Sequence, residues 1–203
     1  MSNFKVARVI TEHKERYVVK NETGDFEAEL IGNLRFTATE RSDFPAVGDW
    51  VAISEYDTNK ALIHHVYKRN SQIERQAVGK HGEKQLIATN IDVGFIVQAI
   101  SRDFNINRLE RYLTICNASN VTPIIILTKI DLISETELEA ILKEVSNRVK
   151  NTEIIPISNE TNIGIDNIKS KIEKGKTYCL LGSSGVGKST LINSISGEEL
   201  MKT

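Results

Sequence analysis

A glycine-rich segment near the end of the chain carries residue types that could bind phosphate. Residues 182–189, GSSGVGKS, fit the pattern G-x-x-x-x-G-K-[ST], whose glycines let successive backbone N–H groups point at phosphate oxygens. The segment follows an apolar strand pattern and opens a predicted helix, whose dipole adds partial positive charge. We expect Lys188 to meet the β- and γ-phosphates, Ser189 to bind Mg²⁺ and Thr190 to meet the α-phosphate. The predicted contacts of this loop are Gly182, Ser183, Ser184, Gly185, Val186, Gly187, Lys188, Ser189 and Thr190.

A second segment could select the base. Residues 128–131 read TKID and fit the pattern [NT]-K-x-D. The Asp131 carboxylate can accept hydrogen bonds from both N1–H and the 2-amino group of guanine. Adenine offers neither donor in that arrangement, so such a site can reject it by on the order of 10⁴-fold. The tetrapeptide alone is a weak signal, and phosphate loops also occur in ATPases. Together the two motifs predict guanine contacts from Thr128, Lys129, Ile130 and Asp131.

Alternating strand and helix patterns in the second half of the chain must position these motifs. Apolar runs predict strands over residues 93–100, 124–127 and 178–181, with another opening at Ile154. Striped apolar patterns predict intervening helices that begin near residues 107, 134 and 165. Strict alternation of this kind is typical of a parallel α/β sheet, and such sheets bind ligands at the carboxyl ends of their strands.

The first seventy residues favour a different architecture, a small all-β barrel of the OB type. We place Trp50 in the core of this barrel, because it lies within a strand pattern. The predicted domains are an OB-fold domain (residues 1–72), a linker (73–88) and an α/β P-loop domain with an incomplete parallel sheet (89–203). The predicted barrel strands cover residues 4–10, 16–20, 26–30, 50–54 and 61–67.

Composition limits the class of protein. Lysines and arginines number 26 and acidic residues 27, a net charge of −1, so any surface that faces a nucleic acid must be local. The longest apolar runs are far too short to span a bilayer, and the N-terminus lacks a signal core. Cys116 and Cys179 lie in apolar segments, and we expect reduced core thiols. These features predict a soluble cytoplasmic protein that has no membrane partner.

The order of the two motifs is the most specific feature of the chain. In ordinary small GTPases the phosphate loop comes first, whereas here the base-selecting segment precedes it, as is typical of a circularly permuted GTPase. With the predicted barrel, this order resembles the RsgA family of small ribosomal subunit biogenesis GTPases. The resemblance also rests on residues 47–51 (VGDWV), 88–92 (ATNID), 111–113 (RYL) and 182–193.

The resemblance implies a function and further contacts. It implies GTP hydrolysis with Mg²⁺, stimulated by the small ribosomal subunit, with the barrel on ribosomal RNA. It also implies that the loop after the strand at Ile154 meets guanine O6, so Ser158 and Asn159 are predicted GTP contacts, although Asn159 departs from the usual Ser-Ala-Lys pattern. We expect RNA contacts from the barrel face and from a basic set around the linker, Lys68, Arg69, Arg75, Lys80 and Lys84.

The chain departs from the family in two ways. Switch I, an Asp-x-x-Gly motif and a cysteine- and histidine-rich domain that would hold Zn²⁺ should follow residue 203. We therefore expect a fragment with no catalytic residue of its own, which binds GTP or GDP weakly, hydrolyses GTP negligibly and self-associates through a bare sheet edge at residues 178–181. The full-length protein is expected to be a monomer. Thr128 stands where Asn is commoner, and we expect a looser tether between the two motif loops.

Two alternative functions, from other classes of protein, stay open. The chain could be an RNA-binding module that uses nucleotide only as a structural ligand, or an ATP-dependent P-loop enzyme. Guanine selectivity separates the ATP-dependent enzyme from the others, and turnover by the full-length protein separates the GTPase from the RNA-binding module.

Overall fold

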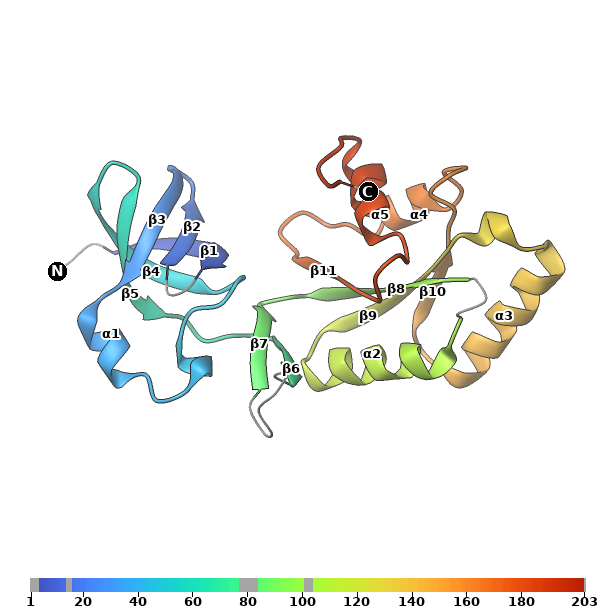
Figure 1. The fold of residues 1–203 in the computed structure, drawn as a ribbon, viewed down its shortest axis with the longest axis horizontal. Helices are drawn as coiled ribbons and strands as arrows, with labels where there is room; N and C mark the ends of the chain where they lie inside the picture. Colours follow the sequence, from blue (N-terminus) through green and yellow to red (C-terminus); the bar gives the residue numbers. More distant parts are fainter. Residues whose placement is uncertain (1–3, 14–15, 77–83, 101–103, 203) are drawn as a thin grey trace. The chain divides into compact units, whose positions relative to one another are not determined.

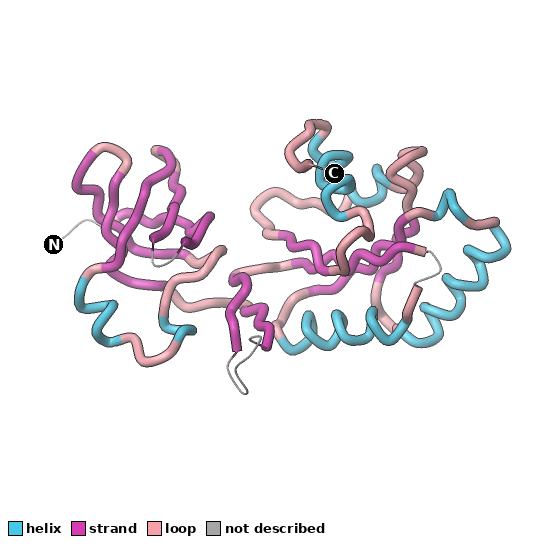
Figure 2. The backbone as a smooth tube through the Cα atoms, viewed as in Figure 1, coloured by secondary structure: helices cyan, strands magenta, loops and turns pink. Residues whose placement is uncertain are grey.

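The structure is a computed structural model that describes residues 4–13, 16–76, 84–100 and 104–202. The chain divides into two compact units, Met1–Ile91 and Asp92–Thr203. Figure 2 shows that strands dominate the first unit, whereas strands and helices alternate in the second.

A closed five-stranded barrel, in the order β1-β2-β3-β5-β4, forms most of the first unit (Figure 1). β3 pairs in parallel with β5, and β1 closes the barrel against β4. Side chains alternate between the two faces of each strand, and the inward set, which includes Val9, Val51 and Ile63, fills the core. The predicted OB-like barrel is therefore confirmed. Its elements are β1 (Lys5–His13), β2 (Arg16–Asn21), β3 (Gly24–Leu30), α1 (Gly32–Thr37), η1 (Arg41–Asp43), β4 (Trp50–Asp57) and β5 (Lys60–Val66).

The predicted place of Trp50 in the barrel core is wrong. Its neighbours Val51 and Ile53 point inward and are fully buried, whereas the Trp50 side chain is on the outside and 43% exposed. The guanidinium carbon of Arg8 lies 5.2 Å from the centre of the Trp50 ring, on the adjacent strand. Successive residues of a strand face opposite sides. Because Val51 and Ile53 face the core, the Trp50 indole lies on the outer surface of the barrel.

A buried ion pair holds the turn before β4. The Asp49 carboxylate has no exposed area, and Arg69 donates to it from Nε (2.8 Å) and from Nη2 (2.6 Å). The same guanidinium donates to the backbone oxygens of Ser42 and Phe44, and the Thr89 hydroxyl donates to Asp49. Arg69 is therefore a structural residue, and its inclusion among the RNA contacts is wrong.

Two short strands lie in the segment that the sequence predicts to be a linker. β6 (Gln72–Gln76) pairs antiparallel with β7 (Lys84–Thr89) in a separate two-stranded sheet. Of the predicted basic set, Lys68 is exposed. Lys80 and the side chains of Arg75 and Lys84 lie outside the described part of the chain. The predicted domain boundaries stay a prediction.

The second unit is built on a four-stranded parallel sheet in the order β10-β9-β8-β11. In Figure 1, α2 and α3 cover one face of this sheet, and α4 and α5 cover the other. A capping box of Ser134 and Glu137 begins α3, near the predicted start of this helix. The α/β prediction is thus confirmed. The elements are β8 (Val93–Ala99), α2 (Ile106–Ala118), β9 (Thr122–Thr128), η2 (Ile130–Leu132), α3 (Glu135–Arg148), β10 (Glu153–Pro156), α4 (Ile165–Lys169), β11 (Tyr178–Leu181) and α5 (Lys188–Ser196).

β11 is an edge strand, as predicted. It pairs with β8 on one side, and within the described residues no strand pairs with its other side. Its four residues are all partly exposed, unlike those of β8, which are all buried. The strand that leads into the predicted phosphate loop therefore has one open side.

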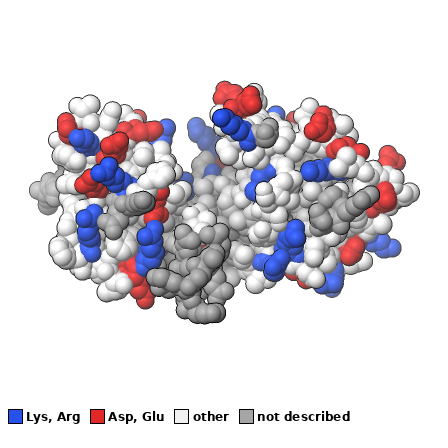
Figure 3. All heavy atoms as spheres, in the orientation of Figure 1, with Lys and Arg blue, Asp and Glu red and all other residues white. Residues whose placement is uncertain are grey.

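The distribution of charged side chains agrees with the balanced numbers of basic and acidic residues. Basic and acidic side chains are interspersed on the face that Figure 3 shows.

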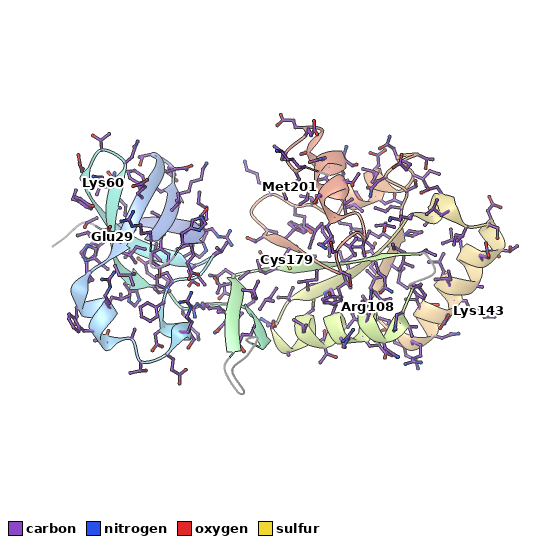
Figure 4. All side chains as sticks on the ribbon, viewed as in Figure 1. Glu29, Lys60, Arg108, Lys143, Cys179 and Met201 are labelled. Atoms are coloured by element: carbon purple, nitrogen blue, oxygen red, sulfur yellow. The ribbon has the colours of Figure 1, made fainter. Side chains whose placement is uncertain are left out.

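Both cysteines are free, and burial raises the pKa of Cys116 to about 11 and that of Cys179, labelled on β11 in Figure 4, to about 12. None of the helices in the described ranges is long and apolar enough to cross a membrane.

The buried ion pair generates a prediction about stability. Arg69→Ala would leave the Asp49 carboxylate enclosed without its counter-charge, and the free energy of unfolding should fall by about 3–5 kcal/mol. Urea unfolding followed by the fluorescence of Trp50, the one tryptophan in the sequence, measures this change in the first unit.

The neighbouring Lys68→Ala is the matched control, because that side chain is exposed. Its effect should stay within about 0.5 kcal/mol. An Arg69→Ala protein as stable as this control would contradict the structural role of Arg69.

Candidate nucleotide-binding site

All predicted nucleotide contacts follow the carboxyl ends of three strands of one parallel sheet. Residues 128–131 come at the end of β9, Ser158 and Asn159 follow β10, and residues 182–190 follow β11. Because parallel strands end at the same edge of a sheet, the fold brings the three loops to one edge (Figure 1). The structure thus assembles segments that are far apart in the sequence.

The phosphate loop begins with a tight approach to the central strand. A Cβ atom on Gly182 would lie 2.3 Å from the Val97 carbonyl oxygen of β8. The loop ends at Gly187, the N-cap of α5, whose φ of 94° is in the left-handed region. Glycine suits both positions, since one has no room for a side chain and the other has a conformation that side chains disfavour.

The Lys188 side chain turns back into this loop. Its Nζ donates to the carbonyl oxygens of Gly182 (2.9 Å) and Ser183 (2.6 Å). The ammonium therefore lies at the start of the loop, close to the N-terminus of α5, where an anion is stabilised by the helix dipole and by free N–H groups.

Ser189 and Thr190 occupy the first turn of α5 and are partly buried. Neither hydroxyl has a hydrogen-bond partner among the residues that the structure describes. A single protein hydroxyl suits Mg²⁺, which keeps several waters and takes its other ligands from phosphates. In the described ranges no group of three or more histidine, cysteine or acidic side chains could hold a metal ion alone.

Thr128 joins the base-selecting segment to the phosphate loop. Its side chain is fully buried, and its hydroxyl donates to the Val186 carbonyl oxygen at 2.7 Å. Thr128 was expected to give a looser tether, but it forms a direct bond between the two loops. A threonine hydroxyl has one hydrogen to donate, and this bond uses it.

The Asp131 carboxylate is available to a ligand. Asp131 is exposed within η2, directly after Lys129, whose φ of 63° is left-handed. No described residue donates a hydrogen bond to the Asp131 carboxylate, and none forms an ion pair with it. The backbone N–H of Ile130 donates to the Ile157 oxygen (3.3 Å), so the segment is connected to the loop after β10.

Ser158 and Asn159 differ in what their side chains can do. Ser158 is fully buried, and its hydroxyl accepts a hydrogen bond from the Thr161 N–H at 3.2 Å. The Asn159 amide lies beside the phosphate loop, because a Cβ on Gly187 would be 3.0 Å from its Nδ2. The structure therefore gives Ser158 a local structural bond and leaves Asn159 facing the site.

Gln98, buried near the end of β8, belongs to none of the predicted motifs. Its Nε2 donates to the Asn105 oxygen at 3.1 Å, and its Oε1 is enclosed without a hydrogen-bond partner among the described residues. A polar residue within an apolar strand run is the signal that could have drawn attention to it.

The bond of Thr128 generates a second prediction. Thr128→Val keeps the shape of the side chain but leaves the buried Val186 carbonyl unpaired, which should lower the free energy of unfolding by about 1–3 kcal/mol. Urea unfolding followed by circular dichroism measures the loss. Thr128→Ser, which keeps the hydroxyl, should retain most of the stability; equal losses in the two variants would mean that packing, and not the bond, matters at this position.

Comparisons with known proteins agree with this geometry. The family model described as RsgA GTPase matches residues 66–203. A protein from Lactiplantibacillus plantarum named small ribosomal subunit biogenesis GTPase RsgA 2 is 40% identical over 98% of this chain and 55% of its own length. The protein named small ribosomal subunit biogenesis GTPase RsgA from Opitutus terrae is 36% identical, over 99% of this chain and 57% of its own length. The chain thus spans about half the length of the curated relatives it matches.

Solved structures share the fold. The crystal structure of YjeQ from Thermotoga maritima matches with a TM-score of 0.76 at 24% identity, over 98% of this chain and 68% of that chain. The structure of YloQ, described as a circularly permuted GTPase, matches with a TM-score of 0.72 at 22% identity, over 97% of this chain and 66% of that chain. With the family model covering more than half of its residues, the chain belongs to the RsgA GTPase family.

Proposed function

We propose that the chain provides the nucleotide-binding site of a GTPase that acts in maturation of the small ribosomal subunit. The observation that carries this proposal is the buried bond between Thr128 and Val186, because it joins a guanine-selecting segment to a phosphate loop. The names of the relatives, small ribosomal subunit biogenesis GTPase, support the cellular role. We place this activity in the cytoplasm, where ribosomal subunits mature.

Each group in the site has a distinct proposed task. Asp131 would accept the N1–H and 2-amino hydrogens of guanine, and the loop N–H groups and Lys188 would bind the phosphates. Ser189 would contribute one oxygen to Mg²⁺, which offsets phosphate charge when it is bound. The backbone N–H dipoles of the loop and the Lys188 ammonium group would together stabilise the phosphate charge. All of these groups lie within the second unit.

Hydrolysis needs more than these binding groups. Phosphoryl transfer depends mainly on positioning the attacking water and stabilising charge in the transition state. The residues assigned to this site hold the base, the phosphates and the metal ion, and we assign none of them to the water. We therefore propose that residues 1–203 alone hydrolyse GTP negligibly, and that the small subunit stimulates hydrolysis by the whole protein.

The outer face of the barrel is the proposed contact with ribosomal RNA. Trp50 is half exposed there, and Arg8 lies over its ring. A groove of roughly 800 Å³ is lined by residues that include Val6, Arg8, Lys20 and Trp50. Aromatic faces and basic side chains are what single-stranded RNA binds, through base stacking and phosphate contacts.

Nucleotide choice is tested at Asp131. Asp131→Asn puts a donor opposite the donors of guanine, so GTP affinity should fall roughly 100-fold through the loss of charge-assisted hydrogen bonds. Xanthine nucleotides, which carry an acceptor at position 2, should then be preferred. Competition binding with GTP, ATP and XTP measures the change.

The matched control is Glu139→Gln, which neutralises an exposed carboxylate on α3; its affinities should equal those of the unaltered protein. If ATP competes as well as GTP in the unaltered protein, the guanine assignment is wrong and an ATP-dependent enzyme is the better reading.

RNA contact is tested at Trp50 and Lys68. Trp50→Ala should weaken binding to the small subunit by roughly 5- to 100-fold, the range for loss of one base stack, whereas Trp50→Phe should retain much of the affinity. Lys68→Gln should lower the salt dependence of binding by about one phosphate contact. Lys143→Gln on α3 is the control for Lys68, because this lysine is also exposed. Unchanged affinity for Trp50→Ala, with an unchanged salt slope for Lys68→Gln, would exclude this face.

A further inference from the structure

A pair of packed rings lies on the outside of the barrel, apart from Trp50. The ring centres of Phe4 and His64 are 4.3 Å apart, and the two ring planes are tilted by 34°. His64 Nε2 and the Ser54 hydroxyl share a hydrogen bond of 2.7 Å, and no other described residue forms a hydrogen bond with the imidazole. The bond fixes the imidazole, and the imidazole packs against the Phe4 ring, which is 44% exposed. One aromatic side chain is thus held in place at the surface by two other residues.

The pair continues a row of side chains on the same face as Trp50. Residues two apart along a strand share a face, so Arg8, Val6 and Phe4 follow one another along the outside of the barrel, with Phe4 directly before β1. Arg8 lies opposite Trp50 on β4, and Ser54 is four residues further along that strand. At about 3.3 Å per residue, the site at Phe4 is roughly 13 Å along the strands from Trp50.

That separation decides which form of RNA could contact both aromatic side chains. Stacked bases are about 3.4 Å apart along one strand of a duplex, and each base face is covered by its neighbours. The bases of an unpaired strand can be splayed apart and stacked one at a time on aromatic side chains. Only a single strand could therefore place separate bases on Phe4 and on Trp50.

The charges beside this row favour RNA over an apolar segment of a partner protein. The neighbouring groove is lined by three basic side chains, Lys5, Arg8 and Lys20, and by one acidic side chain, Glu22. Lys5 forms an ion pair with Glu55 at 2.9 Å, and both side chains are partly exposed. Because exposed ion pairs contribute little to stability, Lys5 can exchange this partner for a phosphate.

We propose that Phe4 is a second stacking platform for an unpaired base of ribosomal RNA, and that His64 is the positioning residue that holds its ring. The inference rests on the proposed function, because it assumes that RNA contacts the outer face of the barrel. It names the form of RNA that fits there, which is a single strand with one base on Phe4 and another on Trp50.

The experiment measures how residues 1–203 bind a single-stranded oligoribonucleotide of about eight nucleotides, a length within the range that one OB barrel covers. Phe4→Ala should weaken binding by roughly 5- to 100-fold, the range for loss of one base stack, whereas Phe4→Tyr should keep the affinity. The salt dependence of binding should stay the same, since stacking releases no counterions. The matched control is Phe36→Ala, which removes an exposed phenylalanine from α1 and should leave the affinity unchanged.

His64 is tested by removing and restoring its ring. His64→Ala should weaken binding of the oligoribonucleotide by about 2- to 10-fold, the worth of one aromatic pair. His64→Phe, which again places a ring against Phe4, should recover the affinity. An RNA duplex should bind equally well to the unaltered chain, to Phe4→Ala and to His64→Ala, a result that a general loss of folding would not produce.

The possible failures can be told apart. If Trp50→Ala weakens binding of the oligoribonucleotide and Phe4→Ala does not, only the second platform is wrong. If Phe4→Ala weakens binding of the duplex by the same factor, Phe4 does not stack on a base. If Phe4→Ala weakens binding to the small subunit but not to the oligoribonucleotide, the platform faces a ribosomal protein instead of RNA. A chain that binds neither the oligoribonucleotide nor the small subunit would contradict the proposed RNA contact itself.

Discussion

One neutral hydrogen bond, from the Thr128 hydroxyl to the Val186 carbonyl, connects the parts of the candidate site. The two residues are 58 positions apart in the sequence, and the bond is buried. It fixes the end of β9 against the phosphate loop, which in turn sets the distance between Asp131 and Lys188. From the same segment, the N–H of Ile130 reaches the loop after β10. The three loops therefore form one connected set of backbone and side-chain bonds.

The barrel unit is held in a different way. Its turn before β4 depends on a buried ion pair, Asp49 with Arg69, and on the backbone oxygens that share the guanidinium. Such a pair stabilises only while both charges are present, because either one alone would be buried without compensation. In the candidate site of the second unit, neutral bonds and glycine contacts serve the corresponding task, the Asp131 carboxylate is exposed, and Lys188 Nζ donates to backbone oxygens of the phosphate loop.

The sequence predicts those features that the chemistry of a ligand requires or that a regular pattern of apolar residues indicates. The phosphate loop and the segment at residues 128–131 are visible because a nucleotide requires those residue types at those spacings. The alternation of strands and helices reveals the parallel sheet. The approach of Asn159 to Gly187 is not visible, because it joins residues from two separate loops.

The wrong predictions concern residues whose local sequence pattern is compatible with two different structures. Alternation in β4 separates Trp50 from Val51 and Ile53, but it does not say which set faces inward; packing of the aliphatic core decides. Arg69 reads as a free cation because its partner Asp49 lies twenty residues earlier. β6 and β7 were missed because they are short and lie in a segment rich in polar and charged residues.

The close approach of Gly182 to Val97 has a consequence for how the site responds to solution conditions. The approach leaves no room for a side chain at Gly182, and the bond of Thr128 is uncharged, so neither contact depends on counterions. Salt screens charges and leaves such contacts nearly untouched. Ionic strength should then act on the attraction between the site and a nucleotide, while the shape of the loop that receives it stays the same.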